Sequence, residues 1–174
     1  LALYWHENYV VEILNKDERH IDALIRVQEE AVQWRATFVY GEPRVENRHI
    51  MWAKLQNLKT VSNLPWLVLG DFNEAMWNFE HISATPRAES QMVAFRDTLE
   101  ICELVDLGFT GVPFSYDNKR SGSASVKVRL DRAMATNAWR NLFAFAEVEH
   151  IPSPCSDHVM LLLKGEADPG PVGR

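Results

Sequence analysis

Acidic and amide side chains occur at the ends of three apolar segments of the sequence. They are Asp71 and Asn73 after the run WLVLG, Asp131 within VRLDRAM, and Asp157 and His158 before VMLLL. Burying a carboxylate without a partner is energetically costly, so an apolar segment carries one only where a partner or a ligand is present. Binding and catalytic side chains gather in loops at the ends of rigid elements. The three stretches therefore predict one shared site.

The residue types in this set indicate chemistry on a phosphate ester. Carboxylate and amide oxygens are hard ligands, which suit Mg²⁺ or Mn²⁺ better than zinc. A histidine titrates near neutral pH and can exchange a proton with a substrate. A divalent ion would neutralise the phosphate while a general base activates water. The set is consistent with metal-dependent cleavage of a phosphodiester.

Each stretch also has a purely structural interpretation. Asp71 and Asn73 could form an Asx turn. Asp131 could make a surface salt bridge with Arg129 or Arg132. A Ser-Asp pair before a strand can be an ordinary turn, and a single histidine is more often structural than catalytic. The functional interpretation depends on the combination of the three stretches.

Patterns of apolar residues predict strands and helices that alternate along the chain. Strands are expected at 9–14, 20–27, 33–40, 66–69, 126–134, 146–151 and 159–164, and helices at 47–58, 90–103 and 137–142. The strands 20–27 and 33–40 are close enough to form an antiparallel hairpin, whereas 78–89 and 119–125 are polar and are expected to be loops. Because some strands are separated by helices and others are not, we predict an α/β domain with a mixed sheet.

The composition is that of a globular domain and excludes several classes of protein. The 174 residues are 47% hydrophobic and 24% charged, which is enough for one domain with a real core. No apolar stretch reaches the roughly 18 residues of a membrane-spanning helix, and the first residues show no signal peptide. Cys102 and Cys155 cannot form a disulfide framework or a CxxC zinc pair. The net charge of −6 argues against nucleic-acid binding through a basic surface alone.

Three motifs in a fixed order resemble one enzyme superfamily. GDFN, RLDR and SDH occur in this order, accompanied by the phrases FVYGEP, LGFTGVPFSYDN and RLDRAMATNAWRNLF. The combination resembles the exonuclease–endonuclease–phosphatase superfamily, and within it the endonuclease domain of plant LINE-type retrotransposons. The resemblance extends over about residues 1–163. It implies a DNase-I-like fold, which is a two-sheet β-sandwich flanked by helices, with Mg²⁺ or Mn²⁺ as cofactor and DNA as substrate.

The resemblance implies a role for each residue of the predicted site. Asp71 would position or deprotonate the attacking water, and Asn73 would hold the scissile phosphate. Asp157 would help to bind the metal, and His158 would stabilise charge on the phosphate. Asp131 would hold the imidazole in one tautomer. Whether Asp71 or His158 is the general base stays open.

Further candidates for substrate contact lie around this set. Tyr40, at the end of its strand, matches a tyrosine that touches the phosphate; an ordinary strand-end aromatic is the alternative. The remaining candidates are Phe114, Tyr116, Asn118, the pair Lys119-Arg120, and Arg129. Core packing is the alternative for Phe114, and simple solvation is the alternative for the basic loop.

The resembled family begins with motifs that this sequence lacks. Its first strands carry an Asn in a WN.RG-like phrase and a metal-binding Glu in an ETK-like phrase, whereas this chain opens at LALYW. Glu7 and Glu12 lie in the wrong context to replace that Glu. We therefore expect residues 1–164 to form a partial domain without its first strands, with an exposed sheet edge, reduced stability and weak or absent catalysis. The Gly/Pro-rich residues 165–174 are expected to be a disordered tail or linker.

Several functions are compatible with these observations. The favoured one is a DNA-nicking endonuclease domain of a LINE-type retroelement, which would act inside the cell, in the nucleus, with a downstream reverse transcriptase domain as its partner in the parent polypeptide. One alternative is a non-catalytic remnant or binding domain. Another is a phosphatase of a small phosphorylated molecule with the same fold, and an abasic-site-specific enzyme is a less favoured choice. No membrane partner is expected.

Overall fold

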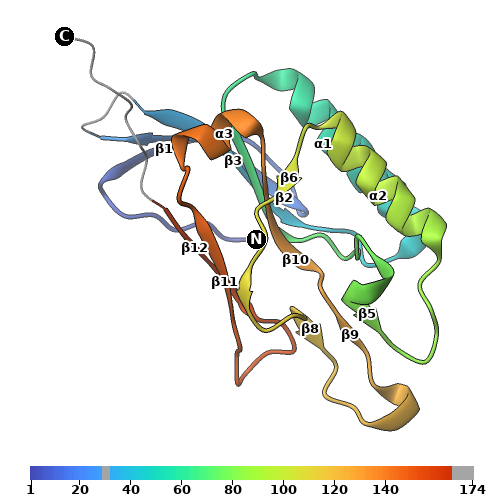
Figure 1. The fold of residues 1–174 in the computed structure, drawn as a ribbon. Coiled ribbons are helices and arrows are strands. Elements are labelled where there is room, and N and C mark those ends of the chain that lie inside the picture. Colours follow the sequence, from blue (N-terminus) through green and yellow to red (C-terminus); the bar gives the residue numbers. More distant parts are fainter. Residues whose placement is uncertain (29–31, 166–174) are drawn as a thin grey trace.

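The computed structural model describes residues 1–28 and 32–165 of the chain. Helices α1 (Arg48–Val61) and α2 (Glu89–Ile101) cover one face of a six-stranded sheet, and a three-stranded sheet with helix α3 (Asn137–Leu142) covers the other (Figure 1). The result is a layered α/β arrangement with two stacked sheets. None of the helices in these residues has the length and apolar character that crossing a membrane requires.

The strands form three sheets. The central sheet has the order β1 (Tyr9–Lys16), β2 (His20–Val27), β3 (Gln33–Tyr40), β4 (Trp66–Asp71), β10 (Asp131–Ala135), β6 (Val105–Asp106). The second sheet has the order β12 (Met160–Lys164), β11 (Glu147–Ile151), β7 (Thr110–Gly111), and the third has β5 (His81–Ile82), β9 (Lys127–Val128), β8 (Tyr116–Asp117). Short 3₁₀ helices at Val45–Asn47, Asn78–Glu80 and Gly122–Ala124 lie in the connections.

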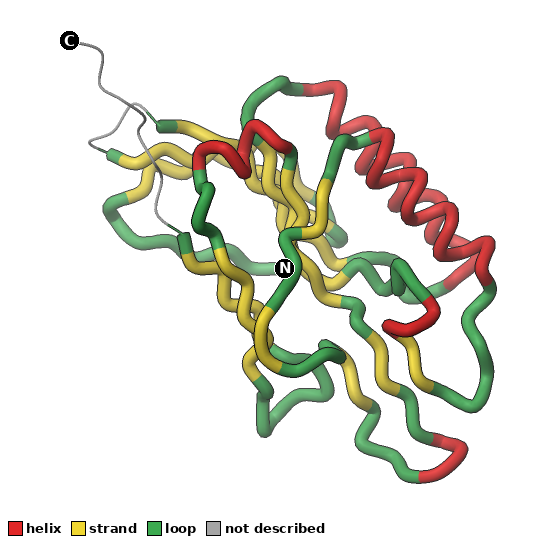
Figure 2. The backbone as a smooth tube through the Cα atoms, viewed as in Figure 1, coloured by secondary structure: helices red, strands yellow, loops and turns green. Residues whose placement is uncertain are grey.

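Strand β4 lies in the middle of the central sheet between neighbours of opposite direction. It pairs in parallel with β3 and antiparallel with β10, while β2 and β3 form the predicted antiparallel hairpin. A parallel pair needs a long crossover connection, and α1 supplies it, as the tube in Figure 2 shows. The mixed sheet predicted from the sequence is confirmed.

The apolar run at the start of β4 is buried on both faces of the sheet. Trp66 and Val68 pack in the cluster beneath α1 and α2, and Leu67 and Leu69 pack in the cluster that faces β11 and β12. Side chains alternate between faces along a strand, so only a continuous apolar run satisfies both. The two helices are joined by aromatic stacking within their shared cluster, where the Trp52 and Phe95 ring centroids lie 4.7 Å apart.

The structure differs from the expected elements at two places. The predicted strand 126–134 is two strands, β9 and β10, separated at Arg129 and Leu130, and β10 is buried throughout rather than half-buried. Its backbone leaves the sheet there because Leu130 donates its N–H to the Ser115 hydroxyl and accepts from the Phe72 N–H. The predicted loop 78–89 contains a 3₁₀ helix and β5.

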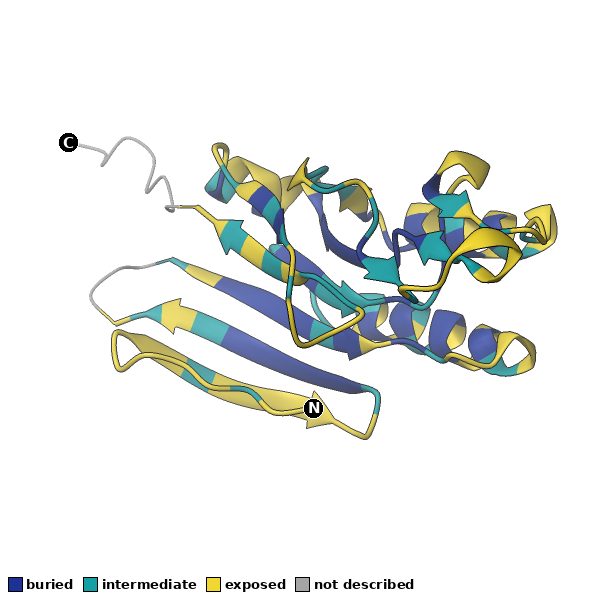
Figure 3. Ribbon diagram, turned by 90° about the horizontal axis from the view of Figure 1, so that it is seen from below, coloured by how far each residue is buried: buried dark blue, intermediate teal, exposed yellow. Residues whose placement is uncertain are grey.

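Strand β1 forms an outer edge of the central sheet and exposes apolar side chains. Tyr9, Val10, Ile13 and Leu14 are each between 39% and 46% exposed, and Figure 3 shows this strand almost entirely in the exposed colour. An exposed edge with apolar surface is what the sequence led us to expect. The predicted disordered tail lies, apart from its first residue, outside the described residues, and so does part of the polar break at 28–30.

A buried ion pair joins the β2–β3 hairpin to α1. Asp22 and Arg35 are each 1% exposed, and the Arg35 guanidinium donates to both carboxylate oxygens at 2.8–3.0 Å. Arg35 also donates to the carbonyl of Leu58 at 2.5 Å, and the Thr37 hydroxyl donates to Asp22 at 2.7 Å. Every formal charge in this cluster is therefore hydrogen-bonded, which is the condition for tolerating it in the interior.

Replacing Asp22 with Ala should destabilise the domain strongly. The substitution leaves the Arg35 guanidinium buried without its carboxylate, which costs about 3–5 kcal/mol of the free energy of unfolding. Urea denaturation followed by far-ultraviolet circular dichroism measures the change. Glu12→Ala, which breaks the exposed pair with Arg26 on the same hairpin, is the matched control and should leave the midpoint unchanged. A midpoint for Asp22→Ala as high as that of the control would contradict the role assigned to the buried pair.

Candidate active site

Polar residues at one end of three neighbouring strands of the central sheet lie side by side. Tyr40 at the end of β3 is paired with Asp71 at the end of β4, and Asp71 is paired with Asp131 at the start of β10. Residues directly opposite each other on neighbouring strands point to the same face of a sheet. The register therefore brings these three predicted residues into one row.

Close backbone contacts shape the turn that follows β4. The Gly41 N–H donates to the Asp71 carbonyl at 2.6 Å, and a side chain on Gly41 would place its Cβ 2.4 Å from the Phe72 carbonyl oxygen. Gly70 has φ +136°, and a Cβ there would lie 2.1 Å from the carbonyl oxygen of Val39. Glycine is required at both positions, because β3 and β4 approach more closely than side chains allow.

Asp71 and Asn73 are joined by direct hydrogen bonds. The backbone N–H of Asn73 donates to Oδ1 of Asp71 at 2.7 Å, and its side-chain Nδ2 donates to Oδ2 at 2.8 Å. Nδ2 also donates to the carbonyl of Gly41 at 3.1 Å. Phe72 between them is fully buried in the cluster beneath α1 and α2, as the alternation of the motif predicts. Asp71 and Asn73 thus form an Asx turn, and the same two side chains are also candidates for the active site.

A second anchor lies beneath the same turn. The buried carboxylate of Glu74 accepts hydrogen bonds from Arg48 of α1 and from Arg87. Arg48 also donates to the carbonyls of Glu42 and Pro43, at 3.2 and 3.3 Å. The loops after β3 and β4 are therefore tied to each other through one helix side chain.

Asp131 and His158 form a hydrogen-bonded pair. Nδ1 of His158 lies 2.8 Å from Oδ2 of Asp131 and donates to it. This carboxylate raises the pKa of His158 through the hydrogen bond and its charge, against the opposing effect of partial burial, and Asp71 and Asp157 add to the rise. The structure thus places the imidazole where the resemblance implied, with its ring fixed by Asp131.

Ser115, which the sequence did not single out, holds both members of this pair. Its fully buried hydroxyl accepts the N–H groups of Leu130 and Asp131, each at 2.8 Å, and its carbonyl accepts the N–H of Val159 at 2.8 Å. One residue therefore fixes the backbone at Asp131 and next to His158. A serine in an apolar phrase carries no local signal of such a role, because the contacts depend on tertiary register.

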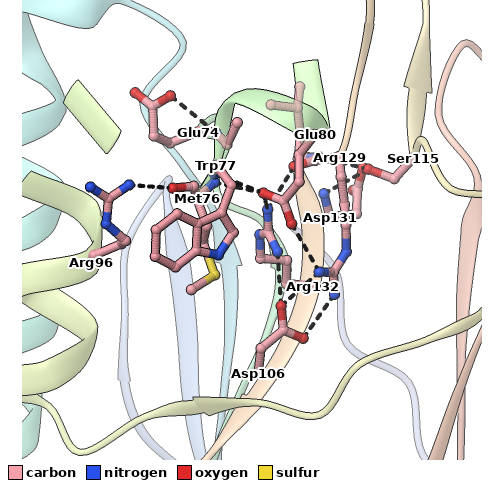
Figure 4. Close-up of polar contacts among 12 residues, drawn as sticks. Glu74, Met76, Trp77, Glu80, Arg96, Asp106, Ser115, Arg129, Asp131 and Arg132 are labelled. Atoms are coloured by element: carbon pink, nitrogen blue, oxygen red, sulfur yellow. Dashed lines mark hydrogen bonds and ion pairs between the residues drawn. The ribbon is translucent and has the colours of Figure 1, made fainter. Parts of the chain in front are cut away.

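A buried charge network around Arg132 holds β10 in place (Figure 4). Arg132 donates to Glu80 and, at 2.8 Å, to Asp106, and Arg129 donates to Glu80 at 3.1 Å and to Asp106 at 2.8 Å. These carboxylates occupy both guanidinium groups, so the surface salt bridge considered for Asp131 is wrong. Arg129 is only 6% exposed, and the structure does not bring it to the site as a substrate contact.

The carboxyl of Asp71 has a raised pKa. Partial burial and the charge of Asp131 raise the pKa of its carboxyl to about 6, although the Asn73 N–H, His158 and Arg48 act in the opposite direction. Two carboxylates in register cannot both ionise as easily as one alone. Asp71 is therefore poised to exchange a proton near neutral pH.

A pocket of about 340 Å³ opens beside His158. It is lined by Val112, Pro113, Phe114, Ser115, Asp117, Lys119, Lys127, Pro152, Ser153, Ser156, Asp157, His158 and Val159. Phe114 and Lys119 are therefore close to the site, as is the exposed Asp157. The Tyr116 ring lies 5.1 Å from the imidazole, and its backbone forms a bridge with His158.

Two other predicted residues have different surroundings. Asn118 closes its own loop, since its side chain accepts the N–H groups of Arg120 and Val126 and donates to the carbonyl of Ala124. Tyr40 is 44% exposed, and the guanidinium of Arg19, which sequence reasoning also missed, lies 5.1 Å from its ring centroid. Tyr40 thus lies in the same row as Asp71 and Asp131, and the Arg19 guanidinium lies over its ring.

The donors of the site do not form a complete metal centre. Within residues 1–28 and 32–165, no three His, Cys, Asp or Glu side chains lie close enough together to hold a metal ion. The carboxylates of Asp71 and Asp131 accept hydrogen bonds from Asn73 and His158. The described residues therefore do not complete a site for Mg²⁺ or Mn²⁺ on their own.

Comparison with known proteins decides the family. Residues 1–158 match the endonuclease/exonuclease/phosphatase family. The chain belongs to this family. A search of curated protein sequences gave no significant match. The family assignment agrees with the GDFN, RLDR and SDH motifs and with the arrangement of the side chains that they carry.

Solved structures of family members share the fold. The endonuclease domain of TRAS1, a telomere-specific non-LTR retrotransposon, is 18% identical, with a TM-score of 0.68 over 92% of this chain and 70% of that chain. The human Nocturnin catalytic domain is 15% identical (TM-score 0.52; 95% of this chain, 62% of that chain). Sphingomyelinase C from Streptomyces griseocarneus is 11% identical (TM-score 0.53; 86% and 55%). This chain spans less than two thirds of the last two. The predicted DNase-I-like fold is confirmed, and the similarity to the TRAS1 endonuclease domain is a similarity of fold.

Replacing Asp131 with Asn should lower the pKa of His158. Asparagine can still accept the Nδ1–H hydrogen bond but removes the negative charge that stabilises the imidazolium. The ion pair contributes stability below the pKa of an unfolded histidine, about 6.5, and loses it as pH rises through the higher folded value. NMR titration of the His158 ring protons measures the change, with His49, exposed on α1, as the internal control. An unchanged His158 titration in the variant would refute the pairing.

Proposed function

We propose that this domain hydrolyses phosphodiester bonds of DNA, as a nicking endonuclease of the retroelement type. The observation that carries the proposal is that two acid–base groups with raised pKa values, Asp71 and His158, lie at the same end of the sheet. Asp71 has a pKa raised to about 6, and His158 has a pKa raised by Asp131. A carboxyl and an imidazole whose pKa values are shifted by their surroundings are typical of sites of acid–base catalysis.

The perturbations favour Asp71 as the general base. At neutral pH its carboxyl is mostly ionised and can take a proton from water, while the oxygen of that water attacks phosphorus. His158 is held toward its protonated form by Asp131 and would donate a hydrogen bond to a phosphate oxygen as charge develops there. Asn73, fixed through Asp71 and Gly41, would orient the phosphate. The P–O bond to the leaving oxygen then breaks, and that oxygen takes a proton from solvent.

The substrate class has independent but coarser support. The family contains nucleases and phosphatases, and the similar TRAS1 structure is named as a retrotransposon endonuclease domain. We propose that the domain acts in the nucleus, with a reverse transcriptase domain as its partner in the parent polypeptide. We also propose that the activity depends on Mg²⁺ or Mn²⁺, with Asp157 as one ligand. A complete metal centre would need donors beyond those that the described residues bring together.

Nicking of supercoiled plasmid tests the activity. Because the described residues do not complete a metal centre, we expect at most slow conversion to the open-circular form with Mg²⁺ or Mn²⁺, and loss of conversion in EDTA. Asp71→Asn and His158→Ala should each reduce the rate by about 10²-fold or more, because each removes a group that acts in proton transfer or charge stabilisation. Asp97→Asn and His49→Ala, at exposed positions on α2 and α1, are the matched controls.

The same assay separates the alternatives. Near-normal rates in Asp71→Asn or His158→Ala would remove that residue from the mechanism. Release of phosphate from inositol phosphates, without nicking, would favour the small-molecule phosphatase. Absence of both activities would favour the non-catalytic domain.

The pH dependence of nicking should report the Asp71 carboxyl. If Asp71 is the base, kcat/KM rises with pH through about 6, where its carboxyl ionises. Because Asp71 and Asp131 interact, the limb belongs to the pair. Asp131→Asn removes the neighbouring negative charge and should move the limb to lower pH. A rising limb that stays in place in this variant would contradict the assignment.

A further inference from the structure

The row of polar residues at the end of the central sheet continues onto β2. The N–H of Tyr40 donates to the carbonyl of Arg19 at 2.8 Å, one step beyond the paired residues His20 and Val39. Arg19 therefore lies opposite Tyr40 and shares its face of the sheet. Neighbouring strands are about 4.8 Å apart, so Arg19 lies roughly 10 Å from Asp71 along the row.

The Arg19 guanidinium is held in place but not saturated. It lies over the Tyr40 ring, with its NH2 group 3.1 Å from Glu42 Oε2 and its NH1 group 3.4 Å from the Gly41 carbonyl. These contacts, made within the described residues, use two of the five N–H groups that a guanidinium carries. The side chain is 26% exposed, so the remaining donors can reach a ligand.

The negative charge of the site calls for a cation that can attract phosphate. Asp71, Asp131 and Asp157 surround the proposed position of the scissile phosphate and would repel it. Arg48 is buried and donates to Glu74, so it cannot contact a substrate directly. Arg19 is the arginine that the strand register aligns with the site, and planar guanidinium groups bind phosphate oxygens in a bidentate manner.

The distance of Arg19 from Asp71 determines which phosphate group Arg19 can bind. The scissile phosphate would lie between Asp71 and His158, toward β10, whereas Arg19 lies on the other side of Tyr40. We propose that Arg19 binds a second phosphate of the same nucleic-acid strand, adjacent to the scissile one, so that the site is matched to a polynucleotide rather than to a small phosphate ester. This inference rests on the proposed function and specifies its substrate class.

Two variants and a control test the role of Arg19. Arg19→Ala removes the cation, and Glu42→Gln keeps it but removes the carboxylate that competes for it. Arg26→Ala is the control, because Arg26 lies at the far end of the same hairpin in an exposed ion pair with Glu12. Thermal unfolding of each variant shows whether it is folded.

Two measurements are made on each variant. Binding of a fluorescein-labelled DNA duplex is followed by fluorescence anisotropy in EDTA at several salt concentrations. Hydrolysis of bis(p-nitrophenyl) phosphate, which has a single phosphate, is followed by absorbance with Mg²⁺ or Mn²⁺. The first readout needs no catalysis, so it decides the role of Arg19 even if the wild-type chain hydrolyses nothing and the proposed function fails.

The expected pattern differs between the two substrates. Arg19→Ala should weaken duplex binding roughly tenfold and reduce the salt slope by about one phosphate contact, while turnover of the single-phosphate ester stays within error. Glu42→Gln should tighten duplex binding, and Arg26→Ala should change neither measurement. Wild-type duplex affinity and slope in Arg19→Ala would overturn the proposal, as would absence of duplex binding by the wild-type chain. An equal loss on both substrates would also overturn it, because Arg19 would then act by shaping the turn at Gly41.

Discussion

The register of β4 against β3 and β10 is the constraint on which the site depends. Because successive side chains alternate between faces, a slip of one residue would turn Asp71 toward the helices and bring Phe72 to the site. The buried run WLVL opposes such a slip from both faces. Gly70 and Gly41 oppose it locally, since β3 and β4 approach so closely that a Cβ at either glycine would collide with backbone. The position of every polar group in the row follows from this register.

Buried charge reinforces the same register at some energetic expense. The Asp22–Arg35 pair fixes the hairpin under α1, and the four-membered network of Glu80, Asp106, Arg129 and Arg132 fixes β10. Apolar residues of similar volume would often stabilise a core as well or better. An ion pair, however, satisfies its hydrogen bonds in few geometries. We therefore interpret both networks as devices that define one arrangement of the strands that carry Asp71 and Asp131.

Sequence reasoning was effective where the signal was local. The run WLVL with GDFN predicted β4 and its polar end, and the apolar pattern at 47–58 predicted helix α1. It failed where tertiary contacts override alternation. Residues 126–134 alternate like one strand, yet the Ser115 hydroxyl and the carbonyl of Glu80 draw the backbone out of the ladder between β9 and β10. Ser115 and Arg19 were missed because their roles exist only once distant strands are in register.

Environment, rather than residue type, divides the roles within the site. Asp71 and Asp131 are paired across two strands, but Asp131 has an imidazole as its partner, whereas Asp71 has the amide of Asn73. The hydrogen bonds from Asn73 offset the burial of the Asp71 carboxyl only in part. Burial and the neighbouring charge of Asp131 therefore raise the pKa of the Asp71 carboxyl, and the hydrogen bond to Asp131 raises the pKa of the His158 imidazole. This division leaves Asp71 able to accept a proton at the pH where His158 still carries one, and it follows from the strand register that placed the two carboxylates side by side.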